Sequence, residues 1–373
     1  MLLKSIGLMS GTSMDGIDAT LLESDGEFLI NPISSLSLHY DKSFKLALRE
    51  QELLVRQAKE NITSLDVIQE STKLHAQLVN DLLSQANLKS TDVDVIGYHG
   101  QTLYHNPQEA ITIQIGNGQL LANLTGINVV NDFRSKDIAH GGQGAPLAPI
   151  YHHALAIKDN YFPVAIVNCG GIANITLIQG LNQVQGFDTG PGNVLLDSYI
   201  RKKTNNTEFM DFNGKYGLKG EVNISVLKIL TAKIQPYLNL ESPKSLDSGA
   251  FELIPELDDL SIYDACATLA YFTSKCIVDS LSSIDIPTKW ILAGGGWNNP
   301  TIVKYLKEIL RQKIGETDIK TASEIGWDSD YMEAEIFAYL AIRNLKNLPT
   351  SLPQITGAKL ATVGGTIYIS EKN

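Results

Sequence analysis

The feature that most constrains the fold of this chain is the stretch from Val164 to Asp197, which reads VAIVNCGGIANITLIQGLNQVQGFDTGPGNVLLD. Apolar runs at Val164–Asn168 and Ile175–Ile178 predict two strands. Between them, Cys169-Gly170-Gly171 predicts a glycine-bearing turn longer than two residues. The stretch therefore predicts an antiparallel hairpin, not an isolated strand.

A carboxylate follows this hairpin at a strand-to-helix junction. The run Val184–Phe187 predicts a third strand that ends at Asp188, and the residues after Asn193 predict a helix. Glycines on both sides of the carboxylate permit another molecule to approach the backbone closely. The N–H groups at a helix N-terminus favour an anion. We therefore expect a phosphate and a catalytic carboxylate to meet at this point.

The N-terminal stretch repeats the same pattern. Leu3–Met9 and Ile17–Leu22 predict strands, and the loop Ser10–Gly16 between them is rich in glycine and hydroxyl groups that can surround phosphate oxygens. The loop is not a Walker A motif, because no lysine follows its second glycine. Taken alone, it fits a polar hairpin turn. Its recurrence near residue 164 favours a duplicated fold that holds phosphate.

Composition excludes several classes of protein. The chain has 373 residues, enough for two or three domains, and its net charge of −11 with a pI near 5.1 argues against nucleic-acid binding. Three cysteines without metal-ligand spacing predict reduced thiols. The apolar part of the N-terminus is too short for a signal peptide, and no run approaches the roughly 18 apolar residues of a membrane helix. We therefore expect a cytoplasmic protein without a membrane partner.

Two further polar segments occur in the first half. The strand Val93–Gly97 leads into Tyr98–His105, which we expect to be a loop. His99 and His105 lack a third metal ligand nearby, so hydrogen bonding to a ligand and a plain structural role both stay open. His75, on the apolar stripe of a helix predicted over 65–87, is expected to be a packed core residue.

The second polar segment, residues 131–149, contains acids, amides, glycines and Arg134. The planar guanidinium of Arg134 suits a carboxylate or phosphate ligand. An ion pair with Asp132 or Asp137 explains the residue equally well.

The second half contains a strand, Lys289–Ala293, that ends in Gly294-Gly295-Gly296. Consecutive glycines allow a flat ring to lie against the backbone, whereas a tight turn alone needs one glycine. A helix predicted over Tyr331–Asn344 begins with Glu333 and Glu335, which can also merely favour the helix dipole. Residues 236–255 are expected to form a surface excursion.

Five of these motifs, in this order, resemble the anhydro-N-acetylmuramic acid kinase family, within the superfamily of acetate and sugar kinases, actin and heat-shock chaperone ATPases. The motifs are Gly7–Asp18, His99–Thr102, Asn131–Arg134, Gly141–Leu147 and Gly186–Asn193.

The resemblance implies an α/β fold of two actin-like (ribonuclease H-like) domains, each with a mixed five-stranded sheet flanked by helices, and a cleft between them. The implied N-terminal domain spans residues 1–134 with a C-terminal return at about 355–373. The implied C-terminal domain spans 135–354.

The resemblance also implies an activity. Members of this family convert 1,6-anhydro-N-acetylmuramic acid, ATP and water to N-acetylmuramic acid 6-phosphate and ADP, in bacterial cell-wall recycling and amino-sugar catabolism. The implied cofactors are ATP and Mg²⁺, with the metal held mainly through the ATP phosphates. A homodimer is implied as well.

Roles for individual residues follow from the same resemblance. Asp188 is the implied catalytic base, which activates the water that attacks C1. The implied sugar-binding residues are Gln101, Asn131, Arg134 and Glu333. The implied nucleotide-binding residues are Gly11, Thr12, Ser13, Met14, Asp15, Gly16, Ile17, Asp18, Gly170, Gly171, Gly294, Gly295 and Asn298.

Two other functions remain as alternatives on the residues alone. An ATP-switched binding protein of the same fold needs no small-sugar pocket, so the dense polar motifs at 99–105 and 131–147 argue against it. A polyphosphate phosphatase should offer a basic channel, and this acidic chain shows little sign of one.

Overall fold

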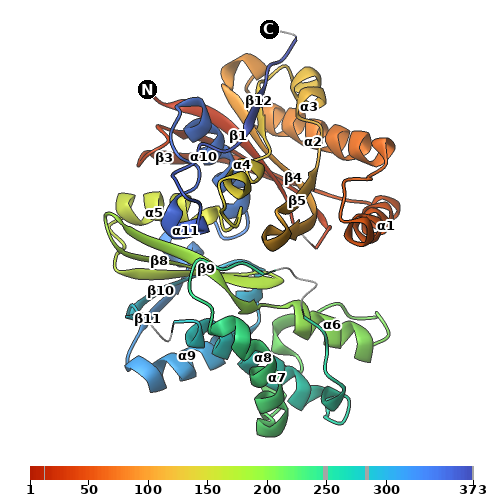
Figure 1. Ribbon diagram of the computed structural model, residues 1–373, viewed down its shortest axis with the longest axis vertical. Coiled ribbons are helices and arrows are strands. Elements are labelled where there is room, and N and C mark those ends of the chain that lie inside the picture. The colour runs from red at the N-terminus through yellow and green to blue at the C-terminus, as the bar shows by residue number, and fades with distance from the viewer. Residues whose placement is uncertain (12, 247–250, 282–284, 372–373) are drawn as a thin grey trace. The chain divides into compact units, whose positions relative to one another are not determined.

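The computed structural model describes residues 1–11, 13–246, 251–281 and 285–371. The chain divides into two compact units, Met1–Asn160 with Tyr331–Asn373, and Tyr161–Asp330 (Figure 1). This division differs from the predicted boundaries, because residues 135–160 and 331–354 fall in the first unit. None of the helices in the described ranges is both long enough and apolar enough to cross a membrane.

The first unit contains a sheet of seven strands in the order β12-β6-β4-β1-β2-β3, with β5 paired to β4 (Figure 1). Strands β1, β2 and β3 form an antiparallel meander, while β1, β4 and β6 run parallel. The chain returns at its C-terminal end to pair β12 with β6. The bounds are β1 (Leu3–Ser10), β2 (Gly16–Ser24), β3 (Ile30–His39), β4 (Val95–Asn106), β5 (Ile111–Ile115), β6 (Val129–Asn131) and β12 (Thr366–Tyr368).

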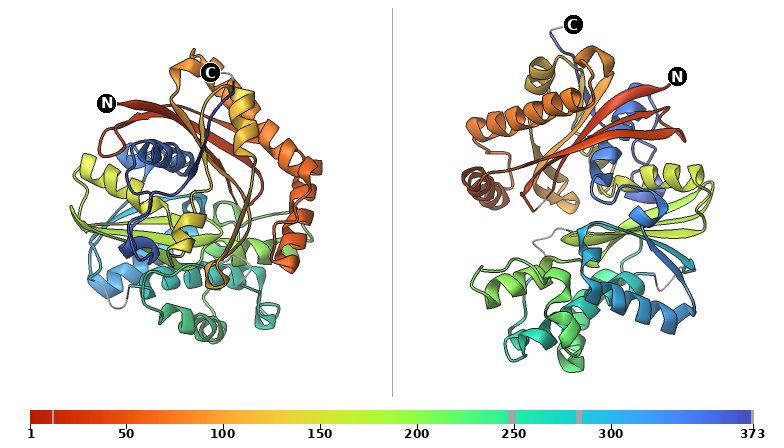
Figure 2. Two further views of the ribbon diagram at one scale, coloured as in Figure 1. Left: turned by 45° about the horizontal axis from the view of Figure 1, so that its top comes forward. Right: turned by 180° about the vertical axis from the view of Figure 1, so that it is seen from behind.

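Helices cover both faces of this sheet, as Figure 2 shows. Side chains alternate between faces along a strand, so Ile6 and Leu8 of β1 pack into the cluster that includes α1 and α2, while Gly7 faces α10. His75 of α2 is fully buried, and its Nδ1 lies 2.7 Å from the Ser71 carbonyl oxygen, which confirms it as a core residue. The helices are α1 (Lys42–Ala58), α2 (Leu65–Gln85), α3 (Gly118–Thr125), α4 (Ser135–Ala139), α5 (Ala148–Lys158), α10 (Met332–Leu345) and α11 (Pro353–Thr356).

Glycines in two neighbouring strands allow α10 to lie directly on the sheet. A Cβ atom added to Gly7 would lie 1.9 Å from the Ala334 carbonyl oxygen, and one added to Gly97 of β4 would lie 2.0 Å from that of Phe337. This backbone-to-backbone contact explains why the segment after residue 330 belongs to the first unit.

The second unit contains a five-stranded sheet in the order β11-β10-β7-β8-β9. Four helices pack on one face of it, around the apolar side chains of β7, β8 and β10 (Figure 1). The bounds are β7 (Val164–Cys169), β8 (Ile172–Gly180), β9 (Gln183–Pro191), β10 (Lys289–Ala293), β11 (Asp318–Thr321), α6 (Val194–Lys203), α7 (Ile224–Leu238), α8 (Ile262–Asp279) and α9 (Pro300–Ile314).

The two sheets share one arrangement. In each, three sequential strands pair antiparallel, the first of them pairs parallel with a fourth strand, and that strand pairs parallel with a fifth, giving β3-β2-β1-β4-β6 and β9-β8-β7-β10-β11. The predicted fold class of two mixed-sheet α/β domains is confirmed. The predicted strand number holds for the second sheet, but β5 and β12 bring the first sheet to seven.

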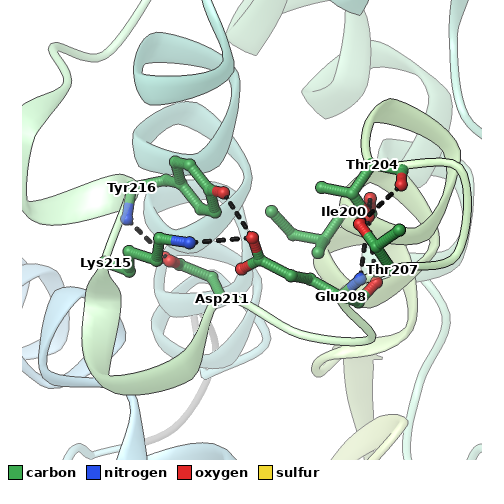
Figure 3. Close-up of polar contacts among 7 residues, drawn as sticks. All are labelled: Ile200, Thr204, Thr207, Glu208, Asp211, Lys215 and Tyr216. Atoms are coloured by element: carbon green, nitrogen blue, oxygen red, sulfur yellow. Dashed lines mark hydrogen bonds and ion pairs between the residues drawn. The ribbon is translucent and has the colours of Figure 1, made fainter.

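The segment that follows α6 is tied together by polar contacts. Figure 3 shows the Glu208 carboxylate accepting hydrogen bonds from Lys215 Nζ at 2.7 Å and from the Tyr216 hydroxyl at 2.9 Å. Buried Asp211 accepts from the Tyr216 N–H and, through its carbonyl oxygen, from Asn299 at the start of α9. The segment is thereby anchored to the turn that follows β10.

Candidate active site

The first glycine turn joins β1 to β2 through Gly11–Asp15. Its carbonyl oxygens are held from outside the turn: Gly11 O accepts from Gln101 Nε2 at 3.0 Å, and Asp15 O accepts from the Tyr40 N–H at 3.0 Å. Met14 has a φ of +57° and is buried, so its side chain anchors the turn in the core. The carbonyl groups of Gly11 and Asp15 and the buried side chain of Met14 thus hold the described part of the turn.

The remaining residues of this stretch divide by exposure. Ser13 and Asp15 are exposed, Gly11, Gly16 and Asp18 are half-buried, and Ile17 is buried in β2. The Asp15 carboxylate pairs with Lys45 at 3.0 Å, and Asp18 Oδ1 accepts from the Ser37 hydroxyl at 2.6 Å. Thr12 lies outside the described residues. Met14 and Ile17 can meet a ligand only through their backbone.

Three of the predicted sugar-binding residues gather at the carboxyl ends of the parallel strands. Ser10 of β1 is in register with Gln101 of β4, and Tyr98 of β4 is in register with Asn131 of β6. Asn131 Nδ2 donates to the Tyr98 carbonyl oxygen at 2.7 Å. Gln101 is fully buried, and its Oε1 has no hydrogen-bond partner in the described chain. An unsatisfied buried acceptor beside the glycine turn is a feature that a ligand donor would complete.

Arg134 is oriented by a neutral histidine. Its Nη2 lies 2.9 Å from His99 Nε2, and its Nη1 donates to the Gly144 carbonyl oxygen at 2.7 Å. Burial, reinforced by the Arg134 charge, holds the pKa of His99 well below its ordinary value, so Nε2 stays an acceptor. Asp137, proposed above as an ion-pair partner, instead accepts hydrogen bonds from Ser351, Thr356 and the Gly144 N–H.

The prediction of a loop over Tyr98–His105 is wrong. These residues belong to β4, which continues to Asn106 because β5 pairs with it antiparallel. His105 Nδ1 lies 3.0 Å from the Thr112 hydroxyl on β5. No cluster of three or more His, Cys, Asp or Glu residues suited to a metal ion occurs within the described ranges.

Glu333 lies in the first turn of α10 and is exposed. Its neighbour Glu335 is buried and accepts a hydrogen bond from the Tyr151 hydroxyl at 2.7 Å. The two acids therefore differ: Glu335 is part of the interior, and Glu333 lies at the surface.

Three glycine turns meet in the second unit. The N–H groups of Gly192 and Asn193 donate to the carbonyl oxygens of Gly171 and Gly170 at 2.9 and 2.8 Å. A Cβ on Gly296 would lie 2.5 Å from Cys169 Sγ and 2.9 Å from Asn193 Nδ2. The turns after β7, β9 and β10 therefore form one contiguous surface. Because turn carbonyls already accept these N–H groups, the start of α6 offers fewer free donors than the sequence predicts.

Only some of these glycines face open space. A Cβ on Gly294 would lie 2.2 Å from Asn168 Oδ1, so the packing of the turn itself explains this glycine and Gly296. Gly171 and Gly295 would meet nothing within 4 Å, and Asn298 is exposed at the end of the same turn. The open positions are the ones at which a ligand could lie against the backbone.

Asp188 lies inside β9, not at its end, because pairing with β8 continues to Pro191. Its side chain is 8% exposed, and Oδ2 accepts a hydrogen bond from the Leu246 N–H at 2.7 Å. The Asp188 N–H donates to the Lys244 carbonyl oxygen at 3.0 Å, and the Tyr237 hydroxyl donates to the Asp188 carbonyl oxygen at 2.7 Å. A backbone N–H donated to a carboxylate favours its ionised form.

Sequence reasoning missed the residues that surround Asp188. Tyr237, Lys244 and Leu246 fall in the segment expected to be a surface excursion, yet Lys244 is only 5% exposed. An isolated lysine beside Pro243 carries no periodicity that could have marked it as buried.

The arrangement identifies a class of protein first. Two sheets of the ribonuclease H-like strand order, each opening with a glycine-bearing hairpin, define the actin-like class of α/β fold. A family model described as anhydro-N-acetylmuramic acid kinase matches residues 3–370. The chain belongs to the anhydro-N-acetylmuramic acid kinase family, and it is an enzyme of the kinase class, as the motifs predicted.

Full-length relatives of that name support the assignment. One from Methylobacterium nodulans is 38% identical over 379 residues, covering 97% of this chain and 99% of the relative. One from Rhizorhabdus wittichii is 39% identical over 376 residues, covering 98% of each. One from Rhodospirillum rubrum is 38% identical over 367 residues, covering 98% of this chain and 94% of the relative.

Solved structures of other proteins match this chain at much lower sequence identity. Component A of (R)-2-hydroxyglutaryl-CoA dehydratase from Acidaminococcus fermentans matches with a TM-score of 0.49 and 13% identity, covering 92% of this chain and 99% of the other. A ROK hexokinase from Thermus thermophilus matches with a TM-score of 0.44 and 11% identity, covering 92% and 100%.

Proposed function

We propose that this enzyme opens the 1,6-anhydro ring of 1,6-anhydro-N-acetylmuramic acid with water while ATP phosphorylates O6. The products would be N-acetylmuramic acid 6-phosphate and ADP. Membership of the family over residues 3–370 supports the substrate. The observation that carries the mechanism is the buried Asp188 carboxylate, held by the Leu246 N–H in the unit that also carries the open glycines.

Asp188 acts as the general base in this proposal. It takes a proton from the water that attacks C1. The C1–O6 bond breaks as O6 bonds to the γ-phosphorus, and the bond from that phosphorus to the bridging oxygen of ADP breaks, so ADP leaves. A hydrolytic inverting glycosidase needs a second carboxyl group to protonate its leaving oxygen. Here the leaving oxygen is captured by phosphorus, so one carboxylate suffices. General base catalysis contributes about 10²–10⁴-fold, and positioning supplies much of the rest.

The nucleotide would contact glycine turns of each unit. In the first unit, Gly11, Ser13, Asp15 and Gly16, together with the backbone of Met14, Ile17 and Asp18, would face the phosphates; in the second, Gly170, Gly171, Gly294, Gly295 and Asn298 would contact the rest of the nucleotide. Thr12 is included on family resemblance alone. The exposed Ser13 and the open Gly171 and Gly295 fit this assignment.

Mg²⁺ would be held mainly by the ATP phosphates. The oxygen atoms of Ser13 and Asp18 are the hard ligands that this ion prefers, and Mg²⁺ commonly binds through one or two carboxylates plus substrate phosphates. When bound, the ion would neutralise charge on the phosphates. Both carboxylates of this stretch already have a partner, because Asp15 pairs with Lys45 and Asp18 Oδ1 accepts from the Ser37 hydroxyl.

The sugar would be bound by Gln101, Asn131, Arg134 and Glu333. The buried Oε1 of Gln101 is an acceptor suited to a sugar hydroxyl. The guanidinium of Arg134, oriented by neutral His99, suits the carboxylate of the muramic acid.

The biological setting follows from the family. We place the reaction in peptidoglycan recycling in the bacterial cytoplasm, with a homodimer as the expected assembly. The three buried, unpaired cysteines are consistent with a reducing compartment.

Replacement of the proposed base tests the mechanism. Asp188→Asn keeps the shape of the side chain but cannot accept the proton, so turnover should fall by about 10²–10⁴-fold or more while ATP and sugar still bind. Turnover is measured as ADP release, and binding by calorimetry. Asp259→Asn, at an exposed position in the same unit, serves as the matched control and should retain full activity.

Labelled water adds an independent readout. Oxygen from ¹⁸O-water should appear at C1 of the product and not in the phosphate. Near-normal turnover of Asp188→Asn would remove this residue as the base, and label in the phosphate would indicate hydrolysis of ATP instead.

A further inference from the structure

Lys244 is a buried cation next to the proposed catalytic carboxylate. Its side chain is 5% exposed, and burial lowers its pKa from the ordinary value. Within the described part of the chain no carboxylate forms an ion pair with it. A buried lysine without an acidic partner is unfavourable unless other groups replace its water, so its surroundings indicate why it is retained.

Three carbonyl oxygens solvate the ammonium group. Lys244 Nζ donates to Leu238 O at 3.0 Å, to Leu240 O at 3.1 Å and to Tyr237 O at 3.3 Å, which accounts for all three of its protons. Two of these oxygens belong to the last turn of α7, where the helix dipole favours a cation. Nζ also lies 4.9 Å from the ring centre of Tyr237 and 5.7 Å from that of Phe187. The lysine therefore closes the loop 239–246 onto the end of α7.

The same loop holds Asp188 at three points. The Lys244 carbonyl oxygen accepts from the Asp188 N–H, the Leu246 N–H donates to Asp188 Oδ2, and the Tyr237 hydroxyl donates to the Asp188 carbonyl oxygen. Two of these contacts hold the backbone of β9 and one holds a carboxylate oxygen. Burial, followed by the negative charge of Asp188, raises the pKa of Tyr237, so its hydroxyl remains protonated and donates.

We propose that Lys244 and Tyr237 are positioning residues that hold the Asp188 carboxylate in its working orientation. The inference rests on the proposed function, because it assumes that Asp188 is the base. It also gives a role to part of residues 236–255, the segment that was expected to be a surface excursion. Lys244 acts through the loop backbone and touches no reacting atom.

Removal of the ammonium group should weaken the contacts of the loop 239–246 with the end of α7 and with Asp188. With an apolar side chain at this position, three buried carbonyl oxygens lose their donor, and buried groups without partners destabilise the local arrangement. The loop 239–246 would then shift to reach water, and the Leu246 N–H would leave Asp188 Oδ2. Misplacement of a catalytic group by about 1 Å can reduce a rate by about 100-fold.

The experiment measures kcat and KM for three substitutions. Lys244→Met keeps the length of the side chain but not the charge, and kcat should fall by about 10–100-fold while KM for ATP and sugar changes by less than about 3-fold. Tyr237→Phe removes only the hydroxyl and should lower kcat by a smaller factor. Lys244→Arg retains donors for the carbonyl oxygens and should recover part of the lost kcat.

Lys233→Met is the matched control. Lys233 is exposed on the same helix α7, so the same change of charge there should leave kcat unaltered. Circular dichroism of every variant checks that it is folded. If Lys244→Met does not fold, Tyr237→Phe, which is nearly isosteric, decides the question.

The outcomes separate this inference from the proposed function. If Tyr237→Phe and a folded Lys244→Met both keep kcat within about twofold of the parent while Asp188→Asn is inactive, the positioning role is overturned and the base survives. If Asp188→Asn itself retains turnover, the proposed base fails, and the positioning role fails with it. An equal rise in KM and fall in kcat/KM at constant kcat would also contradict positioning, because it would show a loss of binding only.

Discussion

At the scale of single residues, buried histidines make the stability of the first unit depend on pH. All seven histidines of the chain lie between residues 39 and 153. His75 and His152 are fully buried, and burial lowers the pKa of each from 6.5 to about 4. Burial also lowers the pKa of His99.

The sign of the effect follows from proton binding. Below pH 6.5 these histidines bind protons in the unfolded chain but stay neutral in the folded first unit. A fall in pH therefore favours unfolding. We predict that His75 and His152 each remove about 2 kcal/mol of stability between pH 7 and pH 5, at 1.36 kcal/mol per pKa unit. Hydrogen exchange corrected for intrinsic rates, read on peptides of residues 1–160, measures this loss.

The second unit should respond in the opposite direction. Burial raises the pKa of Asp197 to about 6, partly offset by Arg201 and reinforced by Asp211. Its folded state therefore binds the proton more tightly, and this contribution to stability grows as the pH falls through 6. Opening free energies that fall equally in both units, or that stay constant in the first, would contradict this account. His39→Gln, at an exposed position, is the control substitution for these measurements.

At the scale of elements, α10 depends on glycines in the strands beneath it. A Cβ on Gly97 would lie 2.0 Å from the Phe337 carbonyl oxygen, and neither backbone can give way without moving the helix. Gly97→Ala should therefore destabilise the chain by about 1–3 kcal/mol or more, the range for overpacking a close-packed interior. Thermal unfolding measures the loss.

Gly180→Ala is the control for this prediction. A Cβ there would lie 3.7 Å from Gln183 Oε1, an ordinary contact with a flexible side chain. An unfolding temperature for Gly97→Ala equal to that of Gly180→Ala would show that α10 does not lie on β4 as closely as described.

The elements also show what the sequence could and could not predict. Apolar runs located β1, β2, β7, β8 and β10, because each is buried on both faces. The edge strand β3 was missed, since its serine-rich sequence INPISSLSLH is largely accessible. The polar segment after Gly97 was expected to be a loop, but pairing with β5 makes it part of β4. The apolar run Ala110–Ile115 predicts the partner strand, but the polar residues themselves do not indicate that the two segments pair.

The candidate site also combines residues that the sequence could predict with residues that it could not. Glycine turns and Asp188 were visible as local patterns, because a turn or a carboxylate between glycines is specified by adjacent residues. The contacts made by Lys244 and Tyr237 depend on where a long segment returns in space, and no local pattern encodes that return.

At the scale of the whole molecule, one strand order occurs twice and the two copies carry different polar residues. The first unit holds Gln101, Asn131 and Arg134 at the edge of its sheet, and the second holds Asp188 and the open glycines. In the proposed mechanism, the base lies in only one of the two copies. We therefore expect ATP turnover by this enzyme to depend on the anhydro sugar.

The most direct test is ADP release by the full chain with Mg²⁺ and ATP, measured with and without 1,6-anhydro-N-acetylmuramic acid. We predict release that depends on the sugar and a product heavier than the sugar by one water and one phosphoryl group. N-acetylmuramic acid, which lacks the anhydro bridge, serves as the control and should stimulate poorly. ADP release at the same rate in the absence of the anhydro sugar, or a product without the added water, would contradict the account.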